Sequence, residues 1–201
     1  MGWRERKKQQ TRIALSWAAI RLSVERGFDH VKVEDIAAAA GVSPRTFNNY
    51  FSSKAEAIAA RHFERVAQIA EELRARPGHE PLWEAVTQAV FARFALGLTG
   101  GEQPDDNGEW SAGVRRMTRH PAVMGELLKA EQAAAAELAA AVAERTGTDP
   151  GRDLYPRLVA GAVGAAIDAA TELSLRDDPP APLFDLLRDA LAQIAAGLPT
   201  P

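Results

Sequence analysis

Turn signals divide this chain into nine segments of helical length, and none of these segments predicts a β-strand. The signals are glycine and proline clusters at Gly27, Gly41, Pro77-Gly78, Thr99-Gly100-Gly101, Gly147 and Asp177-Asp178-Pro179-Pro180. The segments between them cover about 8–26, 33–40, 44–50, 54–75, 81–98, 109–118, 121–145, 153–176 and 182–197. Composition agrees, because the chain has 40 alanines but only 28 valine, isoleucine and threonine residues together. The sequence therefore predicts an all-α protein.

Positive charge is concentrated near the N-terminus. Residues 1–54 hold ten Lys/Arg and five Asp/Glu, whereas residues 55–201 hold fourteen Lys/Arg and twenty-two Asp/Glu. The net charge is therefore +5 for the first part and −8 for the second, within a total of −3. A basic head on an acidic body suggests that only the head meets a polyanion. Chance clustering explains the charges equally well, so charge alone does not decide the function.

Residues 33–54 have the pattern of a helix-turn-helix. A short helix closes on Gly41, and the next helix begins with Ser43 as its cap and Pro44 in its first turn. The apolar inner face of the pair consists of Ile36, Ala37, Ala40, Val42, Phe47 and Tyr50. The outer face of the second helix carries Arg45, Thr46, Asn48 and Asn49. Any helical hairpin can have a polar outer face, but the complete pattern favours a helix that reads base edges and phosphates.

A longer series of residues surrounds this motif. They are Leu15, Ala18-Ala19, Leu22, Glu25-Arg26-Gly27-Phe28, Val33-Glu34-Asp35-Ile36-Ala37, Ala40-Gly41-Val42-Ser43, Arg45-Thr46-Phe47, Tyr50-Phe51 and Ser53-Lys54. With this series, residues 8–58 resemble the DNA-binding domain of the tetracycline-repressor (TetR) family of bacterial regulators. Beyond residue 58 the resemblance is architectural, because further helices follow as in that family's ligand-binding and dimerisation domain.

The resemblance implies a DNA-binding domain over residues 1–53 and a ligand-binding and dimerisation domain over 54–201. It implies a cytoplasmic homodimer that regulates transcription, as a repressor in preference to an activator. Each recognition helix would bind one half of a near-palindromic operator, and a small hydrophobic ligand would release the DNA. The residues expected at the DNA are Lys32, Ser43, Pro44, Arg45, Thr46, Asn48, Asn49, Tyr50 and Lys54, with Lys54 facing a phosphate.

Three positions depart from the family pattern. Asn48 stands where an aromatic residue is usual, and its amide suits adenine. Lys32 stands where Ser or Thr usually caps the second helix; lysine cannot cap, although its ammonium can reach a phosphate. Ser23 replaces an aromatic core residue, and Trp17 either refills that space or is exposed. These departures weaken any transfer of an operator sequence from the family.

Five basic residues precede or begin the first predicted helix. They are Arg4, Arg6, Lys7, Lys8 and Arg12. Two interpretations stay open: an arm that reaches DNA phosphates or the minor groove, and a solvated flexible tail.

The body of the chain offers apolar residues for a ligand site. The candidates are Trp83, Val90, Phe91, Phe94, Trp110, Val114 and Met117. They would line a pocket among the helices predicted over 81–98, 109–118 and 121–145. Taken singly, each residue is more typical of a plain helical core. Because few charges accompany them, the ligand is expected to be largely hydrophobic, either aromatic or acyl.

Small residues in the helix predicted over 153–176 suggest a subunit interface. Gly161 and Gly164 permit close approach of a second helix, and Asp168 continues the same stripe. From the helix predicted over 182–197, the interface would add Leu187, Leu191 and Ile194. Two copies would then form a four-helix interface. Asp168 is a polar anchor in an interface or a pocket, or else a solvated residue at the helix edge.

Several chemistries find no suitable residues in this sequence. The absence of cysteine excludes disulfides, thiolate catalysis, zinc fingers and iron–sulfur clusters. The histidines, which are His30, His62, His79 and His120, show no pair at metal-ligand spacing. No catalytic, phosphate-loop or dinucleotide motif is present, so we expect no enzyme, cofactor, metal, signal peptide or membrane span. Two alternatives remain: a structural DNA-binding protein without ligand sensing, and a helical small-molecule enzyme with a basic head.

Overall fold

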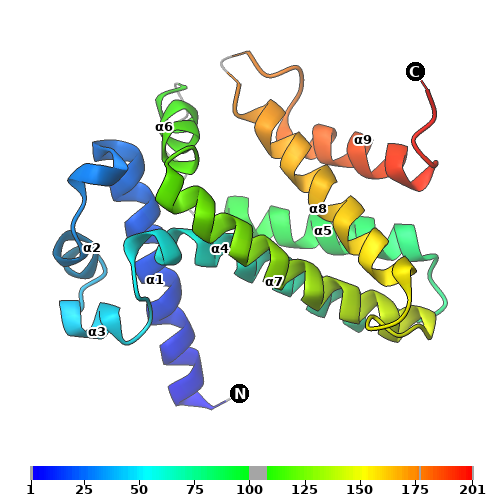
Figure 1. Ribbon diagram of the computed structural model, residues 1–201, viewed down its shortest axis with the longest axis horizontal. Coiled ribbons are helices and arrows are strands. Elements are labelled where there is room, and N and C mark those ends of the chain that lie inside the picture. Colours follow the sequence, from blue (N-terminus) through cyan, green and yellow to red (C-terminus); the bar gives the residue numbers. More distant parts are fainter. Residues whose placement is uncertain (1, 100–107, 177, 201) are drawn as a thin grey trace. The chain divides into compact units, whose positions relative to one another are not determined.

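The computed structural model describes residues 2–99, 108–176 and 178–200, which form nine α-helices and one 3₁₀ helix (Figure 1). They are α1 (Trp3–Arg26), η1 (Phe28–His30), α2 (Val33–Ala39), α3 (Pro44–Asn48), α4 (Lys54–Ala75), α5 (Leu82–Thr99), α6 (Glu109–Thr118), α7 (Pro121–Thr146), α8 (Leu154–Ser174) and α9 (Leu183–Ala195). The described ranges contain no strand, so the predicted all-α fold is confirmed. No helix within them is both long enough and apolar enough to cross a membrane.

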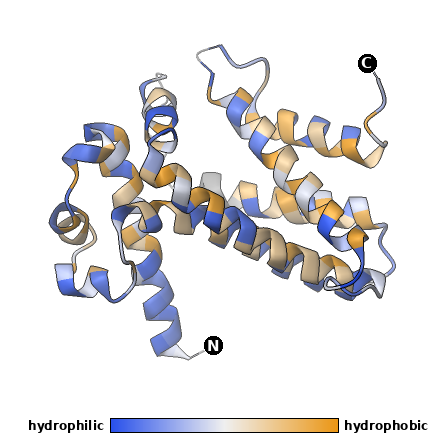
Figure 2. Ribbon diagram, in the orientation of Figure 1, coloured by the Kyte–Doolittle hydropathy of each residue, from blue (hydrophilic) through white to orange (hydrophobic). Residues whose placement is uncertain are grey.

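Helix α1 begins earlier than predicted, at Trp3 instead of about residue 8. The basic N-terminal residues therefore belong to a helix, which corrects the interpretation as a flexible tail. The other interpretation, an arm that reaches DNA phosphates or the minor groove, stays a prediction. The segment holds mostly good helix formers, and Glu5 lies in the first turn, where a negative charge favours the helix. The Lys7 ammonium lies 5.2 Å from the centre of the Trp3 ring, one turn away. Figure 2 shows these first turns of α1 as largely hydrophilic.

The chain divides into two compact units. The first comprises residues 1–63 and 106–130, and the second comprises residues 64–105 and 131–201. Helices α4 and α7 thus contribute to both units. Helix α6 belongs to the first unit, although the sequence analysis assigned its residues to the ligand-binding domain. The functional division at residues 53 and 54 stays a prediction.

The first unit has one apolar core built around α1. Leu15, Ala19 and Leu22 recur at helical spacing on one face of α1 and are 0 to 4% exposed. The core also includes Ile36, Ala37, Phe47, Phe51, Ala57, Ile58 and Met117. Trp17 stays 37% exposed with the Arg61 guanidinium 5.1 Å from its ring centre, which supports the second of its two alternatives. The side chain of Ser23 is itself buried.

Helices α1 and α6 approach very closely at Gly113. A Cβ atom at this position would lie 2.6 Å from Cγ1 of Val24 and 2.9 Å from the Val24 carbonyl oxygen. Both distances are shorter than a carbon atom tolerates, so only glycine fits without movement of the backbone. Trp110 and Val114 of α6 also pack against the core of the first unit. Helix α6 is therefore an integral part of this unit.

The second unit is a helical bundle with its own core. The most buried large residues are Ile69, Leu73, Val86, Val90, Leu138, Val142, Val163, Leu187 and Leu191. Helix α9 packs mainly on α8 and also contacts α5. The Arg145 guanidinium joins the end of α7 to the turn that follows α4, because it donates hydrogen bonds to the carbonyl oxygens of Arg76, Pro77 and Glu80.

Candidate nucleic-acid interface

The turn between α2 and α3 is stabilised by local hydrogen bonds. The Val42 N–H donates to the Ala37 carbonyl over 2.9 Å, and Gly41 adopts a φ of +69°, which favours glycine. The Ser43 Oγ accepts a hydrogen bond from the Thr46 N–H over 3.1 Å and so caps α3 as predicted. Pro44 occupies the first turn, where its missing N–H costs nothing.

Helix α3 is anchored on one side and presents polar residues on the other. Phe47 is fully buried, and its ring centre lies 5.7 Å from that of Phe51. Arg45, Asn48 and Asn49 are exposed. Thr46 is half-buried, and its hydroxyl lies 2.9 Å from the Ser43 hydroxyl. The short helix is therefore held rigidly while three side chains that can read base edges face outward.

Lys32 is exposed just before α2, and its side chain makes no capping bond. The Asp35 carboxylate replaces the cap, because it accepts a hydrogen bond from the Lys32 N–H over 2.9 Å. The Lys32 ammonium is left to face solvent at the start of the motif, where the resemblance expects a DNA contact.

Lys54 has an internal role that the sequence analysis did not predict. Its ammonium donates hydrogen bonds to the carbonyl oxygens of Phe28, over 2.5 Å, and Val31, over 2.8 Å. It also lies 4.1 Å from the centre of the Phe28 ring. Lys54 therefore joins the start of α4 to the segment around η1. An ammonium has three donors, so one N–H remains for a phosphate.

Replacement of Lys54 with alanine is expected to lower both stability and DNA affinity. Loss of two charge-assisted hydrogen bonds from the half-buried ammonium should cost about 1–2 kcal/mol of unfolding free energy. Loss of a phosphate contact should weaken binding to all DNA sequences about equally. It should also reduce the slope of log binding constant against log salt concentration by about one per half-site. Thermal unfolding and salt-dependent anisotropy would measure the two effects. Lys32→Ala is the control, since it should change the salt slope and not the unfolding temperature; an unchanged unfolding temperature for Lys54→Ala would contradict the internal role.

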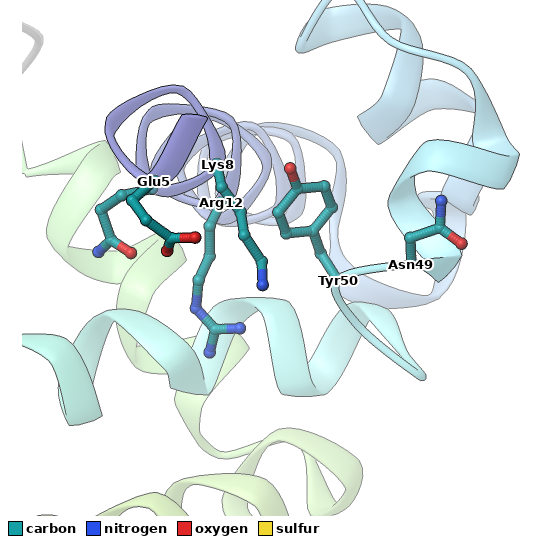
Figure 3. Close-up of a pocket in the computed structure, with 6 residues that line it drawn as sticks. Glu5, Lys8, Arg12, Asn49 and Tyr50 are labelled. Carbon is teal, nitrogen blue, oxygen red and sulfur yellow. The ribbon is translucent and has the colours of Figure 1, made fainter. Parts of the chain in front are cut away.

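A pocket of about 370 Å³ lies between the N-terminal turns of α1 and the end of α3 (Figure 3). It is lined by Glu5, Lys8, Gln9, Arg12, Asn49 and Tyr50. Only the last two were expected at the DNA. Lys8 and Arg12 of α1 belong to the basic residues for which a contact with DNA phosphates was one of two interpretations, whereas Glu5 and Gln9 were not predicted as site residues. Helical spacing places these four residues on one face of α1, and Glu5 joins that face only because the helix begins at Trp3.

The seven predicted ligand-binding residues are divided between the two units. Trp83, Val90, Phe91 and Phe94 belong to α5 in the second unit, whereas Trp110, Val114 and Met117 pack with the core of the first unit. Val90 and Phe94 are buried. The Phe91 ring stacks on the Phe184 ring of α9 at a centre-to-centre distance of 5.8 Å. The α5 residues therefore remain candidates for a ligand site, while those of α6 have a structural role.

The six predicted interface residues also divide into two groups. Gly161 and Asp168 are exposed on α8, and a Cβ atom added to Gly161 or Gly164 would meet nothing within 4 Å. Ile194 is half-buried. Leu187 and Leu191, however, are at most 1% exposed, so their side chains fill the core of the protomer and the interface prediction is corrected for them. Although Asp168 is exposed at the surface, the neighbouring protein partly desolvates its carboxyl and so raises its pKa, and a hydrogen bond with Glu131 opposes this rise.

Comparison with known proteins adds evidence from outside the structure. Residues 17–61 match the model of the family described as "Bacterial regulatory proteins, tetR family". Residues 80–199 match the model described as "MftR C-terminal domain". The HTH-type transcriptional regulator TcmR of Streptomyces glaucescens is 32% identical over 181 residues, which cover 88% of this chain and 79% of TcmR.

Solved structures of similar fold cover nearly the whole chain. The fatty acid degradation regulator FadR from Bacillus halodurans superposes with a TM-score of 0.60 at 16% identity, over 95% of this chain and 97% of FadR. FadR from Thermus thermophilus, a transcriptional repressor in complex with lauroyl-CoA, gives a TM-score of 0.56 at 19% identity, over 94% of this chain and 96% of that protein. At these identities the likeness supports the fold alone.

Proposed function

Because the chain belongs to the TetR family of bacterial transcriptional regulators, we propose that it is a homodimeric repressor of a near-palindromic operator in the cytoplasm. Members of this family are regulators and not enzymes. We further propose that a small hydrophobic ligand releases the protein from DNA. The single observation that carries the DNA-binding proposal is the outer face of α3, where three exposed polar side chains flank a fully buried anchor, Phe47.

The chemistry of this face suits the major groove. An arginine guanidinium pairs with two acceptors of guanine, and an asparagine amide pairs with the donor and acceptor of adenine. Arg45 and Asn48 are three residues apart and thus one turn apart on the same side of α3. In a dimer, the two copies of α3 would read half-sites separated by about one helical turn of DNA.

Arg45→Ala is expected to relax the preference at one base pair of each half-site. A bidentate contact contributes about 1–3 kcal/mol of discrimination, so the preference for the favoured base should fall by roughly five- to 150-fold. Selection of operator sequences from a random duplex library, followed by sequencing, would measure this preference. Arg26→Ala, an exposed substitution at the end of α1, is the control and should leave the selected sequence unchanged. An Arg45 variant that selects the wild-type sequence would show that α3 does not read bases.

The proposed dimer interface lies on the exposed face of α8. Leu154 and Leu158 are 74% and 65% exposed, and Gly161, Ala165 and Asp168 follow them at helical spacing, with the half-buried Gly164 beside them. Burial of an exposed row of leucine and small residues against another surface is favourable, and small residues let a second helix approach closely. A second copy presents the same row and satisfies this need by two-fold symmetry. Of the predicted α9 residues, only Ile194 stays in the proposed interface.

The proposed ligand site lies on α5, where four apolar residues remain from the prediction. A hydrophobic ligand is supported by their character and by the lauroyl-CoA that the Thermus thermophilus FadR, a protein of the same fold, binds. Release of DNA requires that the ligand prefers the protein conformation with low DNA affinity. A preference of about 100-fold shifts the equilibrium by about 2.7 kcal/mol.

Phe91→Ala is expected to weaken the response to ligand while DNA affinity without ligand stays within about twofold. Phe91 is half-buried, so its truncation disturbs the core less than truncation of Phe94, which should cost about 3–5 kcal/mol. Lauroyl-CoA, lauric acid and 2-naphthol are suitable probes in thermal-shift and DNA-release assays. The site would be supported if a probe releases the wild-type protein from DNA but does not release the variant. No response of the wild type to any probe would favour the alternative without ligand sensing.

A further inference from the structure

The N-terminal turns of α1 present a basic row beside the recognition helix. Arg4, Lys8 and Arg12 recur every four residues and therefore lie on one face of the helix. The buried part of α1 begins only at Leu15, so the first three turns extend past the apolar core as a largely hydrophilic helix (Figures 1 and 2). These turns carry exposed charges at Arg4, Glu5, Arg6, Lys7 and Lys8 and contribute little to the apolar core.

The pocket defined above lies where this basic row meets the end of α3. In Figure 3, Lys8 and Arg12 extend from α1 in the same direction, and Tyr50 lies between Lys8 and Asn49 in this view. Its lining holds an ammonium, a guanidinium, two amides and a phenol, all of which can donate hydrogen bonds, and one carboxylate, Glu5. The Arg12 guanidinium lies 4.7 Å from the centre of the Phe51 ring, which orients it against the core.

We propose that this pocket binds a phosphate of the DNA backbone. Helix α1 is then a second DNA-contacting element, and Lys8 and Arg12 are the residues that bind the phosphate. The inference rests on the proposed DNA-binding function. Asn49 and Tyr50 belong both to the pocket and to the set expected at the DNA, so a duplex on α3 brings its backbone to this side of the helix. Two positive charges against one negative charge favour an anion. Glu5 opposes the phosphate and lowers the affinity.

Neighbouring lysines of α1 provide a matched test. Lys8 lines the pocket, whereas Lys7 lies over the Trp3 ring and is absent from the lining. Lys8→Gln and Lys7→Gln each remove one exposed charge from adjacent positions, and glutamine retains the helix propensity of lysine. Glu5→Gln removes the opposing charge. All four full-length proteins would be titrated by fluorescence anisotropy against a duplex selected by the wild type, at several salt concentrations, after circular dichroism has confirmed equal folding.

The proposal expects unequal effects of the two lysines. Lys8→Gln should weaken binding by at least about tenfold and reduce the salt slope by about one per bound protomer. Lys7→Gln should stay within about twofold of the wild type, because an exposed charge outside the pocket is screened. Glu5→Gln should tighten binding by about threefold.

Equal losses of DNA affinity for Lys7→Gln and Lys8→Gln, or no gain of affinity for Glu5→Gln, would contradict the phosphate pocket. Helix α1 would then contribute only non-specific positive charge. The selection experiment with the wild type reports on the proposed function separately. If the wild type selects no duplex, both proposals fail. If it selects one and the variants behave alike, the phosphate pocket fails alone.

Discussion

Gly164→Leu is expected to turn the dimer into a monomer and to weaken operator binding by at least about 100-fold, because each head then binds one half-site alone. A leucine meets open space in the single protomer, since no atom lies within 4 Å of a Cβ at this position. The protomer should therefore fold normally and gain slightly from the loss of a helical glycine. In the proposed dimer the same leucine enters the helix contact twice, at about 1–3 kcal/mol or more for each copy.

Light scattering would report the mass, and fluorescence anisotropy would report the operator affinity. Gly125→Leu is the matched control, because Gly125 is an exposed helical glycine of α7 with nothing within 4 Å of a Cβ. It should remain dimeric and bind DNA like the wild type. A Gly164→Leu variant that scatters as a dimer would exclude Gly164 from the interface, whatever its affinity for DNA.

Gly113→Val should be the most destabilising single substitution proposed for the first unit. The Cβ alone would approach the Val24 carbonyl oxygen to 2.9 Å, and a backbone atom cannot rotate away as a side chain can. The two additional methyl groups of valine increase the overlap. We expect a loss of about 3 kcal/mol of unfolding free energy, at the upper end of overpacking effects.

Chemical denaturation monitored by circular dichroism would measure this loss. Gly125→Val provides the control, because it places the same side chain on a helix without a neighbour, so its effect is limited to helix propensity and should stay below about 0.5 kcal/mol. Val24→Ala combined with Gly113→Val should recover only part of the loss, since it removes the Cγ1 contact and leaves the carbonyl contact. Equal stability of the two glycine variants would show that α6 can move away from α1 without cost.

Local signals made the helix-turn-helix predictable from sequence. The serine cap, the proline in the first turn and the glycine of positive φ each act within four residues, so no knowledge of the rest of the fold was needed. The position of Phe47 in the core followed from helical spacing. The start of α1 was misplaced because the residue before it, Gly2, has no side chain that could cap the helix and mark its start.

Long-range partners were not predictable in the same way. Lys54 bonds to carbonyl groups 23 and 26 residues away, and nothing in its neighbourhood distinguishes this use from a phosphate contact. The leucine spacing of α9 was read correctly as an apolar stripe. The same stripe suits the inside of a protomer or a subunit interface, and the packing of α8 on α9 assigns Leu187 and Leu191 to the inside. Met117 has the same ambiguity between a ligand pocket and a core.

The inclusion of α6 in the first unit limits how this chain can be divided for engineering. A fragment that ends at residue 63 lacks the segment that packs on Val24 and would expose the apolar surface that Met117 and Trp110 cover. The recognition module is therefore discontinuous in sequence, with a second piece that follows α5. A chimaeric sensor that grafts this head onto another body must carry residues 108–130 along with it, or supply a surrogate helix with a glycine where α1 comes closest.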